Sequence, residues 1–260
     1  KENKASDIVL KSKRPIVIIG ESALELESGQ FIFESIKKFL IENNFINESW
    51  NALNILIQNA ASVGAIDLGF FNKNKKNNFD FFKKLNNNEF KLLYFVGSDN
   101  LDFIKKDEFV IYQGSHGDRI AQIADIIFPS AAFTEQNGLF LNLEGRLQKS
   151  IKSTYPPGKS KEDWKIFNMI HRNLNNEDLY KSFNELRNET LKNVKNHSDF
   201  DLLPKTNIKK LNTEVDNFID DKITIKKIDY YFSNSITRSS KTMSDCRTAR
   251  SKILKNGTGS

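Results

Sequence analysis

The chain alternates short apolar runs with segments in which apolar residues recur at helical spacing. Residues 15–20, 92–97 and 109–114 are dominated by aliphatic and aromatic side chains, and each of these runs ends in a glycine. A fourth run, residues 126–128, stops at Pro129. Strands this apolar are typical of a parallel sheet that is covered on both faces. We therefore predict an α/β fold with a layered, mostly parallel sheet flanked by helices.

Helical spacing of apolar residues predicts the helices of this fold. The expected helical segments are residues 29–42, residues 50–60 (through Trp50, Leu53, Ile57 and Ala60), residues 119–124, residues 162–174 and residues 179–194. His171 falls on the apolar face of the segment 162–174. We interpret it as a packed, hydrogen-bonded core histidine rather than a metal ligand.

The pattern divides the chain into three consecutive segments. Residues 1–155 are predicted to form the α/β domain, with a polar surface insertion at residues 72–78. Residues 156–228 are predicted to be a helical extension packed on that domain, with a short strand-like piece near its end, at residues 223–228. The Ser/Thr/Lys-rich residues 229–260 are predicted to be an extended tail that docks on another surface.

Composition and charge exclude several kinds of partner and of site for this chain. The chain has 260 residues, a net charge of +6 and a pI near 9.1, but its lysines are scattered in short pairs rather than gathered in a basic stripe. We therefore expect no nucleic-acid partner. The single cysteine, Cys246, excludes an internal disulfide, an iron–sulfur cluster or a cysteine-rich zinc site built from this chain alone. The three histidines lie far apart, and no apolar stretch approaches the length of a membrane span.

The loop at residues 114–119 is the first candidate for binding chemistry. Ligands of open α/β sheets lie beyond the carboxyl ends of the strands, and glycines let the backbone approach an anion. Gly114 and Gly117 could serve in this way, with Arg119 as the partner of the anion. The simpler interpretation, which we favour, is that Asp118 caps the helix that begins at Arg119 and that the glycines only permit the turn. No complete G-x-G-x-x-G motif is present.

The same loop also carries the residue types of a hydrolytic triad. Ser115, His116 and Asp118 are close neighbours in the sequence, and side chains of such neighbours point in different directions. The chain has no G-x-S-x-G nucleophile elbow. We therefore do not predict a hydrolase.

The stretch from residue 124 to residue 148 is the second candidate. A strong turn signal, Asn137-Gly138, precedes the apolar run 139–141. Glu135 and Glu144 could bind amines of a ligand, and Arg146 could bind its phosphate. Equally, Glu144 and Arg146 could form a local ion pair that fixes the loop, and composition leaves both alternatives open.

Several motifs together resemble a known family. They are YQGSHGDR (112–119), ADIIFP (124–129), AAFTE (131–135) and NLEGR (142–146), joined by AASVGAIDLG (60–69), PPG (156–158) before EDWKI (162–166), and DYYFSNSITR (229–238) before SKTM (240–243) and Cys246. They resemble the molybdopterin oxidoreductase family, and most closely the large iron–sulfur (G-type) subunits of respiratory complex I, NADH:ubiquinone oxidoreductase. The motifs appear in the family's order from about residue 14 to residue 247. The tail is the most specific, because other molybdopterin enzymes continue there into a pterin-binding β-barrel.

The resemblance implies a molybdopterin oxidoreductase-like fold in a structural segment of the complex I peripheral arm. Cluster-binding cysteines and the molybdenum ligand of the family belong upstream of the matched part, so a fragment or a separately encoded piece is expected. We accordingly predict no catalytic, cofactor-binding or metal-binding residue in this chain, with Glu144 and Arg146 bonded to protein. Iron–sulfur clusters are expected in the N-terminal part of the same subunit.

The partners implied are that iron–sulfur part and other peripheral-arm subunits, in a proton-pumping complex that passes electrons from NADH to ubiquinone. The place implied is the matrix side of the mitochondrial inner membrane, or the cytoplasmic face of the inner membrane in a bacterium. The alternative is an active molybdopterin- or nucleotide-binding oxidoreductase domain, in which the 114–119 loop, Glu144 and Arg146 hold the ligand.

Overall fold

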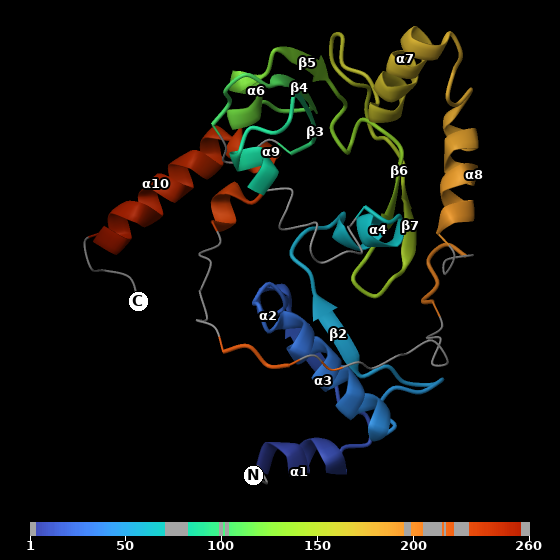
Figure 1. The fold of residues 1–260 in the computed structure, drawn as a ribbon, viewed down its shortest axis with the longest axis vertical. Coiled ribbons are helices and arrows are strands. Elements are labelled where there is room, and N and C mark those ends of the chain that lie inside the picture. The colour runs from blue at the N-terminus through green and yellow to red at the C-terminus, as the bar shows by residue number, and fades with distance from the viewer. Residues whose placement is uncertain are drawn as a thin grey trace. The chain divides into compact units, whose positions relative to one another are not determined.

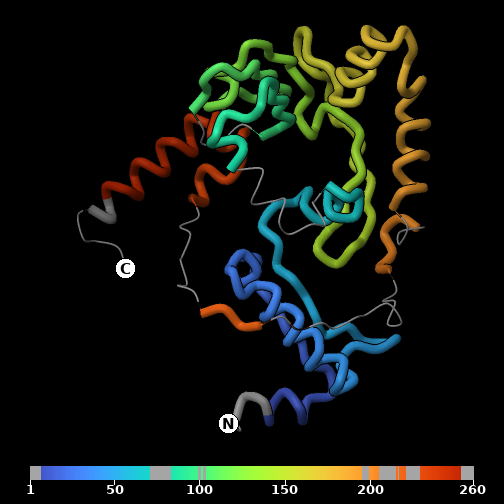
Figure 2. The backbone as a smooth tube through the Cα atoms, viewed as in Figure 1, coloured from blue at the N-terminus to red at the C-terminus, as the bar shows by residue number. Residues whose placement is uncertain are grey.

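The computed structural model describes residues 4–70, 83–98, 101, 104–194, 199–204, 215, 217–220 and 229–255. Contacts divide the chain into two compact units that interleave along the sequence, as the colours of Figure 2 allow the reader to trace. The first unit comprises Lys1–Phe71, Leu139–Lys149 and Thr190–Lys226, and the second comprises Asn72–Gly138, Ser150–Glu189 and Lys227–Ser260. The contacts thus group the chain differently from the predicted segments, whose boundaries at residues 155 and 228 stay a prediction.

The first unit is built around a parallel pair of strands, β1 and β2 (Figure 1). Its elements before residue 71 are, in order, α1 (Lys4–Lys11), β1 (Val17–Gly20), α2 (Glu21–Leu24), α3 (Gly29–Glu42), β2 (Leu53–Leu56) and α4 (Ser62–Asp67). Strand β1 pairs with β2 in the register Val17↔Leu53. The core beside them contains Leu40, Phe45, Ile46 and Ala52, which are all buried.

The helix predicted over residues 50–60 is wrong, because the structure places strand β2 there. Exposure alternates along β2, with Leu53 and Ile55 half-buried and the residues after each of them exposed, which is the period of a strand. Pairing with β1 satisfies the backbone groups of this segment. The indole N–H of Trp50 also donates to the backbone oxygen of Pro15 at 2.9 Å, so the segment is fixed to the residues that precede β1.

The second unit contains a three-stranded parallel sheet in the order β3-β4-β5. The strands are β3 (Leu92–Val96), β4 (Phe109–Gly114) and β5 (Ile126–Pro129), and the short helix α6 (Arg119–Ile123) connects β4 to β5. Its core is formed by Leu85, which precedes the sheet, and by buried side chains of the sheet and α6: Leu93, Phe95, Val110, Tyr112 and Ile120. The predicted strands and the α6 helix are confirmed, and with them the fold class of parallel sheets flanked by helices.

The remaining elements follow the sheet in sequence. They are β6 (Gly138–Leu141) and β7 (Leu147–Ser150), which form a two-stranded sheet, and the helices α7 (Asp163–Asn175) and α8 (Phe183–Asn193). His171 of α7 is hydrogen-bonded as predicted, through Nδ1 and the backbone oxygen of Glu177 at 3.0 Å. It is only half-buried, so its prediction as a core residue is wrong.

The C-terminal segment is helical rather than extended, which corrects the prediction for residues 229–255. It forms η2 (Tyr230–Phe232), α9 (Ser235–Arg238) and α10 (Lys241–Lys255), and α10 extends away from the β3-β4-β5 sheet (Figure 1). A capping box between Asn234 and Thr237 starts α9. The guanidinium of Arg247 lies 4.6 Å from the ring centroid of Phe232 and 2.6 Å from a carboxylate oxygen of Asp229, which ties α10 to η2.

Two predicted features, the insertion at residues 72–78 and the strand-like piece at residues 223–228, lie outside the described residues. Within the described part of the chain, no helix has the length and the apolar character that crossing a bilayer requires.

Candidate functional site

The glycines of the 114–119 loop are explained by the packing of the chain itself. A Cβ atom at Gly114 would lie 2.2 Å from the phenolic oxygen of Tyr112, so only glycine fits there. Tyr112 is buried, and its hydroxyl donates to the backbone oxygen of His116, which closes the loop. A Cβ atom at Gly117 would lie 3.2 Å from the Cβ of Ala121 in α6. Neighbouring side chains therefore occupy the space that a ligand would need beside Gly114.

Asp118 stands at the predicted N-cap position of α6, but its side chain makes no capping hydrogen bond. One carboxylate oxygen instead accepts from Nε of Arg238 at 2.7 Å. This partly buried ion pair joins the loop after β4 to the end of α9, across 120 positions of sequence. The sequence pattern gave no signal for it, because the partner of Asp118 lies in a distant polar segment.

A polar pocket of about 490 Å³ opens beside this pair. Its lining residues are Gly117, Asp118, Arg119, Asp229, Phe232, Arg238, Ser239 and Arg247. Two of the three arginines, Arg238 and Arg247, pair with the two acids of the lining, Asp118 and Asp229. The pocket thus contains Arg119, the predicted partner of an anion, but most of its charge is already compensated by the chain.

The residue types of a hydrolytic triad do not converge. Ser115 Oγ and His116 Nδ1 lie 3.0 Å apart, within hydrogen-bond distance. The carboxylate of Asp118 is directed to Arg238 instead of the imidazole. Asp118 thus does not orient His116 as the third group of a triad would.

The second candidate stretch is likewise bonded to protein. Glu144 Oε2 and Arg146 Nη2 lie 3.7 Å apart, which is the local ion pair that the sequence left open as one alternative. Arg146 Nη1 also donates to the backbone oxygen of Asp201. The side chain of Asn142 holds the turn between them, because its Oδ1 accepts from the backbone N–H groups of Glu144 and Arg146 at 3.0 and 2.9 Å.

Glu135, the other acid proposed to bind a ligand, stabilises its own turn. Its Oε2 accepts from the backbone N–H of Ala132 at 2.9 Å. The site residues predicted from the sequence are therefore ordered mainly by contacts within the chain. Among the described residues, no three His, Cys, Asp or Glu side chains gather as they would to hold a metal ion.

A chain of polar groups centred on the buried Gln113, which sequence reasoning missed, links the sheet to α7. The hydroxyl of Tyr94 donates to Gln113 Oε1 at 2.5 Å, and Gln113 Nε2 donates to Asp163 Oδ1 at 2.7 Å. The other carboxylate oxygen of Asp163 accepts from Gln136 Nε2 at 2.8 Å. Gln113 is fully buried. Burial, and after it the charge of Asp163, raises the pKa of Tyr94. The glutamine in the otherwise apolar run 109–114 was the one signal for this network.

The residue before α7 is a buried acid with several cationic and N–H partners. Glu162 Oε2 accepts from the indole N–H of Trp164 at 2.7 Å, and Oε1 lies 3.3 Å from Nζ of Lys152 and 3.4 Å from Nζ of Lys165. Burial acts to raise the pKa of Glu162, but the hydrogen bonds from Trp164 and Lys152 and the charge of Lys165 outweigh it and lower that pKa. The start of α7 is therefore fixed by two acids, Glu162 and Asp163.

The chain has relatives among known proteins. The chain matches the molybdopterin oxidoreductase family over residues 2–173. It belongs to that family. The matched range contains both candidate loops, the β3-β4-β5 sheet and most of α7.

Subunits of NADH-ubiquinone and NADH-quinone oxidoreductases are similar to nearly the whole chain. The 75 kDa subunit of NADH-ubiquinone oxidoreductase from Reclinomonas americana is 34% identical over 248 residues, covering 92% of this chain and 34% of the relative. The G subunit of NADH-quinone oxidoreductase from Rickettsia bellii is 33% identical over 257 residues, covering 98% of this chain and 36% of the relative. The mitochondrial 78 kDa subunit of NADH-ubiquinone oxidoreductase from Neurospora crassa is 31% identical over 250 residues, covering 92% of this chain and 32% of the relative.

These similarities confirm the resemblance found in the sequence. The chain spans about a third of the length of the curated relatives it matches.

The family raises the question of whether these residues fit a bound pterin. The face of Gly114 is filled by Tyr112, and the charged groups at residues 144 and 146 are bonded to one another or to the backbone. A cofactor would have to displace these contacts. The space beside Gly114 and the charged groups at residues 144 and 146 are therefore already taken by contacts within the chain.

Proposed function

We propose that this chain is a structural segment of the large subunit of respiratory complex I, NADH:ubiquinone oxidoreductase, and that it carries no redox centre itself. The similarity of nearly the whole chain to large subunits of NADH-quinone and NADH-ubiquinone oxidoreductases supports the assignment to the complex. Its partners would be the iron–sulfur part of the same subunit and other peripheral-arm subunits. Its place would be the matrix side of the mitochondrial inner membrane, or the cytoplasmic face of a bacterial inner membrane.

The observation that carries the non-catalytic part of the proposal is the bonding of Arg146. Its guanidinium binds the carboxylate of Glu144 and the backbone oxygen of Asp201, so the arginine proposed for a ligand phosphate instead holds the chain together. Groups that grip a cofactor need free donors aimed at the ligand position. The remaining role is packing: the segment would cover clusters held elsewhere in the subunit and offer surface to neighbouring subunits.

The test is purification of the native complex through an affinity tag on this chain, from detergent-solubilised membranes. We expect complex I subunits at stoichiometric amounts, NADH–quinone activity and no molybdenum or oxidised pterin above background. Failure of complex I subunits and NADH–quinone activity to co-purify with the tagged chain would overturn its assignment to the complex. Stoichiometric molybdenum would instead establish the active-enzyme alternative, for which the pocket of about 490 Å³ beside Arg119 provides the space.

Arg146→Gln separates the two roles of that arginine within the same experiment. If Arg146 is structural, the variant lowers the amount of chain in the complex but leaves the NADH oxidation rate per assembled complex unchanged. If it holds a cofactor, the rate per complex falls together with the cofactor content.

A further inference from the structure

An apolar groove lies along one face of α7, within the second unit. It has a volume of about 330 Å³ and is lined by Phe128, Pro129, Lys159, Lys161, Ile166, Met169, Ile170, Asn173 and Leu174. We call it the α7 groove. None of the residues to which the sequence pattern pointed as ligand-binding belongs to it, and its volume falls in the range of about 300–1,000 Å³ that is usual for binding pockets.

The walls of the α7 groove expose large apolar side chains. Leu174 is 76% exposed and Met169 is 45% exposed. Single exposed apolar residues are common, but a concave apolar surface bordered by charge is characteristic of an interaction site. Burying Leu174 and Met169 against a partner would remove this surface from water.

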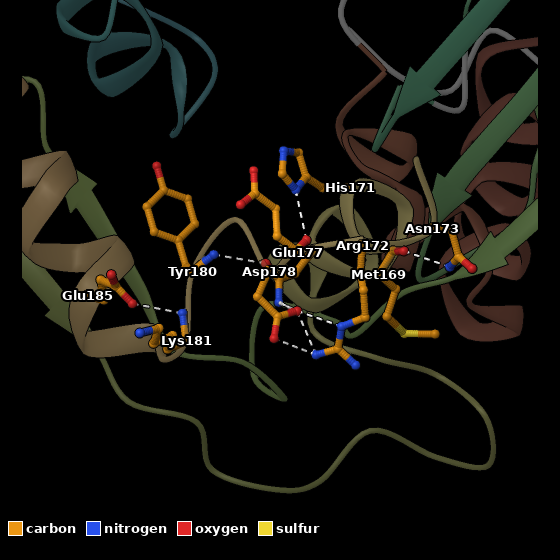
Figure 3. A network of polar contacts seen from close by, with 10 residues as sticks. Met169, His171, Arg172, Asn173, Glu177, Asp178, Tyr180, Lys181 and Glu185 are labelled. Carbon is orange, nitrogen blue, oxygen red and sulfur yellow. Dashed lines mark hydrogen bonds and ion pairs between the residues drawn. The ribbon is translucent and has the colours of Figure 1, made fainter. Parts of the chain in front are cut away.

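The groove is preformed, because both ends of α7 are fixed. At its start, Asp163 binds Gln113 and Gln136. At its end, Arg172 binds Asp178 through two hydrogen bonds of 2.7 and 2.6 Å, as Figure 3 shows, and the chain reverses at Asn176 in a left-handed conformation. A rigid site loses little conformational entropy when it binds.

The bonding around Met169 leaves its side chain free to line the groove. Asn173 Nδ2 donates to the backbone oxygen of Met169 at 2.7 Å, and the two residues lie together on the side of the helix end away from Tyr180 (Figure 3). The floor is supported as well, since the ring of Phe128 lies 6.3 Å from that of Tyr94.

The rim of the groove is positively charged. Lys159 and Lys161 are exposed, and neither ammonium group has an ion-pair partner among the described residues. The nearby Lys152 and Lys165, in contrast, are both paired with Glu162. The backbone of Lys161 is fixed by hydrogen bonds to Ala131 and Pro129, so its position beside the groove is set by the fold.

We propose that the α7 groove binds an acidic segment of a partner protein, which inserts large apolar side chains beside Met169 and Leu174 and places Asp or Glu carboxylates against Lys159 and Lys161. The identification of that partner as a complex I subunit rests on the proposed function. A second copy of this chain is a poorer occupant, because a symmetric contact would bring both pairs of lysines to the same interface.

The test measures incorporation of tagged variants into the native complex, in competition with the untagged wild-type chain. Leu174→Gln removes an apolar anchor, and Lys161→Glu reverses one rim charge. The matched controls are Ile151→Gln, at an apolar residue that is 79% exposed and not in the groove lining, and Lys91→Glu, at an exposed lysine outside that lining. We expect the groove variants to lose at least about tenfold in the ratio of variant to wild type, and the controls to stay within about twofold.

A photo-crosslinking residue at Asn173 identifies the occupant in the same cells. Crosslinks to an acidic, apolar peptide of another protein support the inference, above all if an acid-to-Lys change in that peptide restores binding of Lys161→Glu. Crosslinks to a second copy of this chain would overturn it, as would groove variants that compete as well as the wild type. If the wild-type chain fails to enter complex I, the proposed function falls, and the crosslinked peptide still decides the chemistry of the groove.

Discussion

Gln113 is the residue at which the link between the sheet and α7 can be broken with the least change in shape. Gln113→Leu keeps a similar volume but removes two hydrogen bonds, one from the hydroxyl of Tyr94 and one to the carboxylate of Asp163. A neutral hydrogen bond contributes about 0.5–1.5 kcal/mol and one to a charged group about 1.5–3 kcal/mol. Tyr94 and Asp163 are only half-buried, so water can partly replace the glutamine. We therefore expect a loss near the lower end of the sum, about 2–3 kcal/mol.

The assay is urea unfolding of the full chain, followed by the fluorescence of Trp164 in a Trp50→Phe background. Trp164 lies in the first turn of α7 and so reports on the unit that contains Gln113, whereas Trp50 belongs to the other unit. The denaturation midpoint should fall without a change in the slope m.

Tyr94→Phe provides the control for this measurement. It loses the first hydrogen bond alone and should cost about 0.5–1.5 kcal/mol. The double variant should cost no more than Gln113→Leu, because the leucine offers no acceptor to Tyr94. A loss below about 1 kcal/mol for Gln113→Leu, or strict additivity of the two changes, would refute the proposed link.

Three further changes test other parts of the structure. The lowered pKa of Glu162 stabilises the fold above the ordinary carboxyl pKa of 4.5, and this contribution is lost as the pH falls through the folded-state value. Glu162→Gln should therefore destabilise the chain at neutral pH and flatten its acid dependence in urea titrations, and an unchanged acid limb would contradict this. Gly114→Ala should cost about 1–3 kcal/mol in thermal unfolding because its Cβ would overlap Tyr112, and a neutral effect would show that the loop has room for a ligand. Arg238→Met should cost about 1–3 kcal/mol, between the values for exposed and buried pairs, and should speed amide exchange in the C-terminal helices. In an Asp118→Asn background the same change should cost less, and equal costs would argue against the pair.

The sheet of the second unit could be predicted because its signals are local. Each of its strands is a short apolar run that ends at a glycine or a proline, and the structure places a strand at each of these runs. The helix predicted over residues 50–60 was wrong because the signal that decides this segment is not local. Leu53 and Ile57 match helical spacing, but Leu53 and Ile55 also match the alternation of a strand, and the pairing with β1 decides between them.

The contacts that order the candidate loops could not be read from the sequence, because their partners are distant. Asp118 was assigned to the helix that follows it, and only the folded chain brings Arg238 to it. The helix α9 was different, since its capping box at Asn234 and Thr237 is a local signal that the polar composition of the tail obscured. Composition therefore misled the prediction of an extended tail, although a short motif within it indicated a helix.

The distribution of bonded and unbonded groups separates a cofactor site from a protein-binding surface. A loop made for an anionic cofactor keeps donors ready, and any group that must give up an internal partner subtracts from the affinity for the ligand. In this chain charged groups of the candidate loops are bonded within the chain: Arg146 holds Asp201 and Glu144, and Asp118 accepts from Arg238 of α9. The free capacity lies at the α7 groove, where Met169 and Leu174 are exposed and the ammonium groups of Lys159 and Lys161 have no ion-pair partner among the described residues. Since apolar area and unpaired charge are what a protein partner can use, we infer that the binding face of this chain has its centre at the α7 groove rather than at the candidate loops.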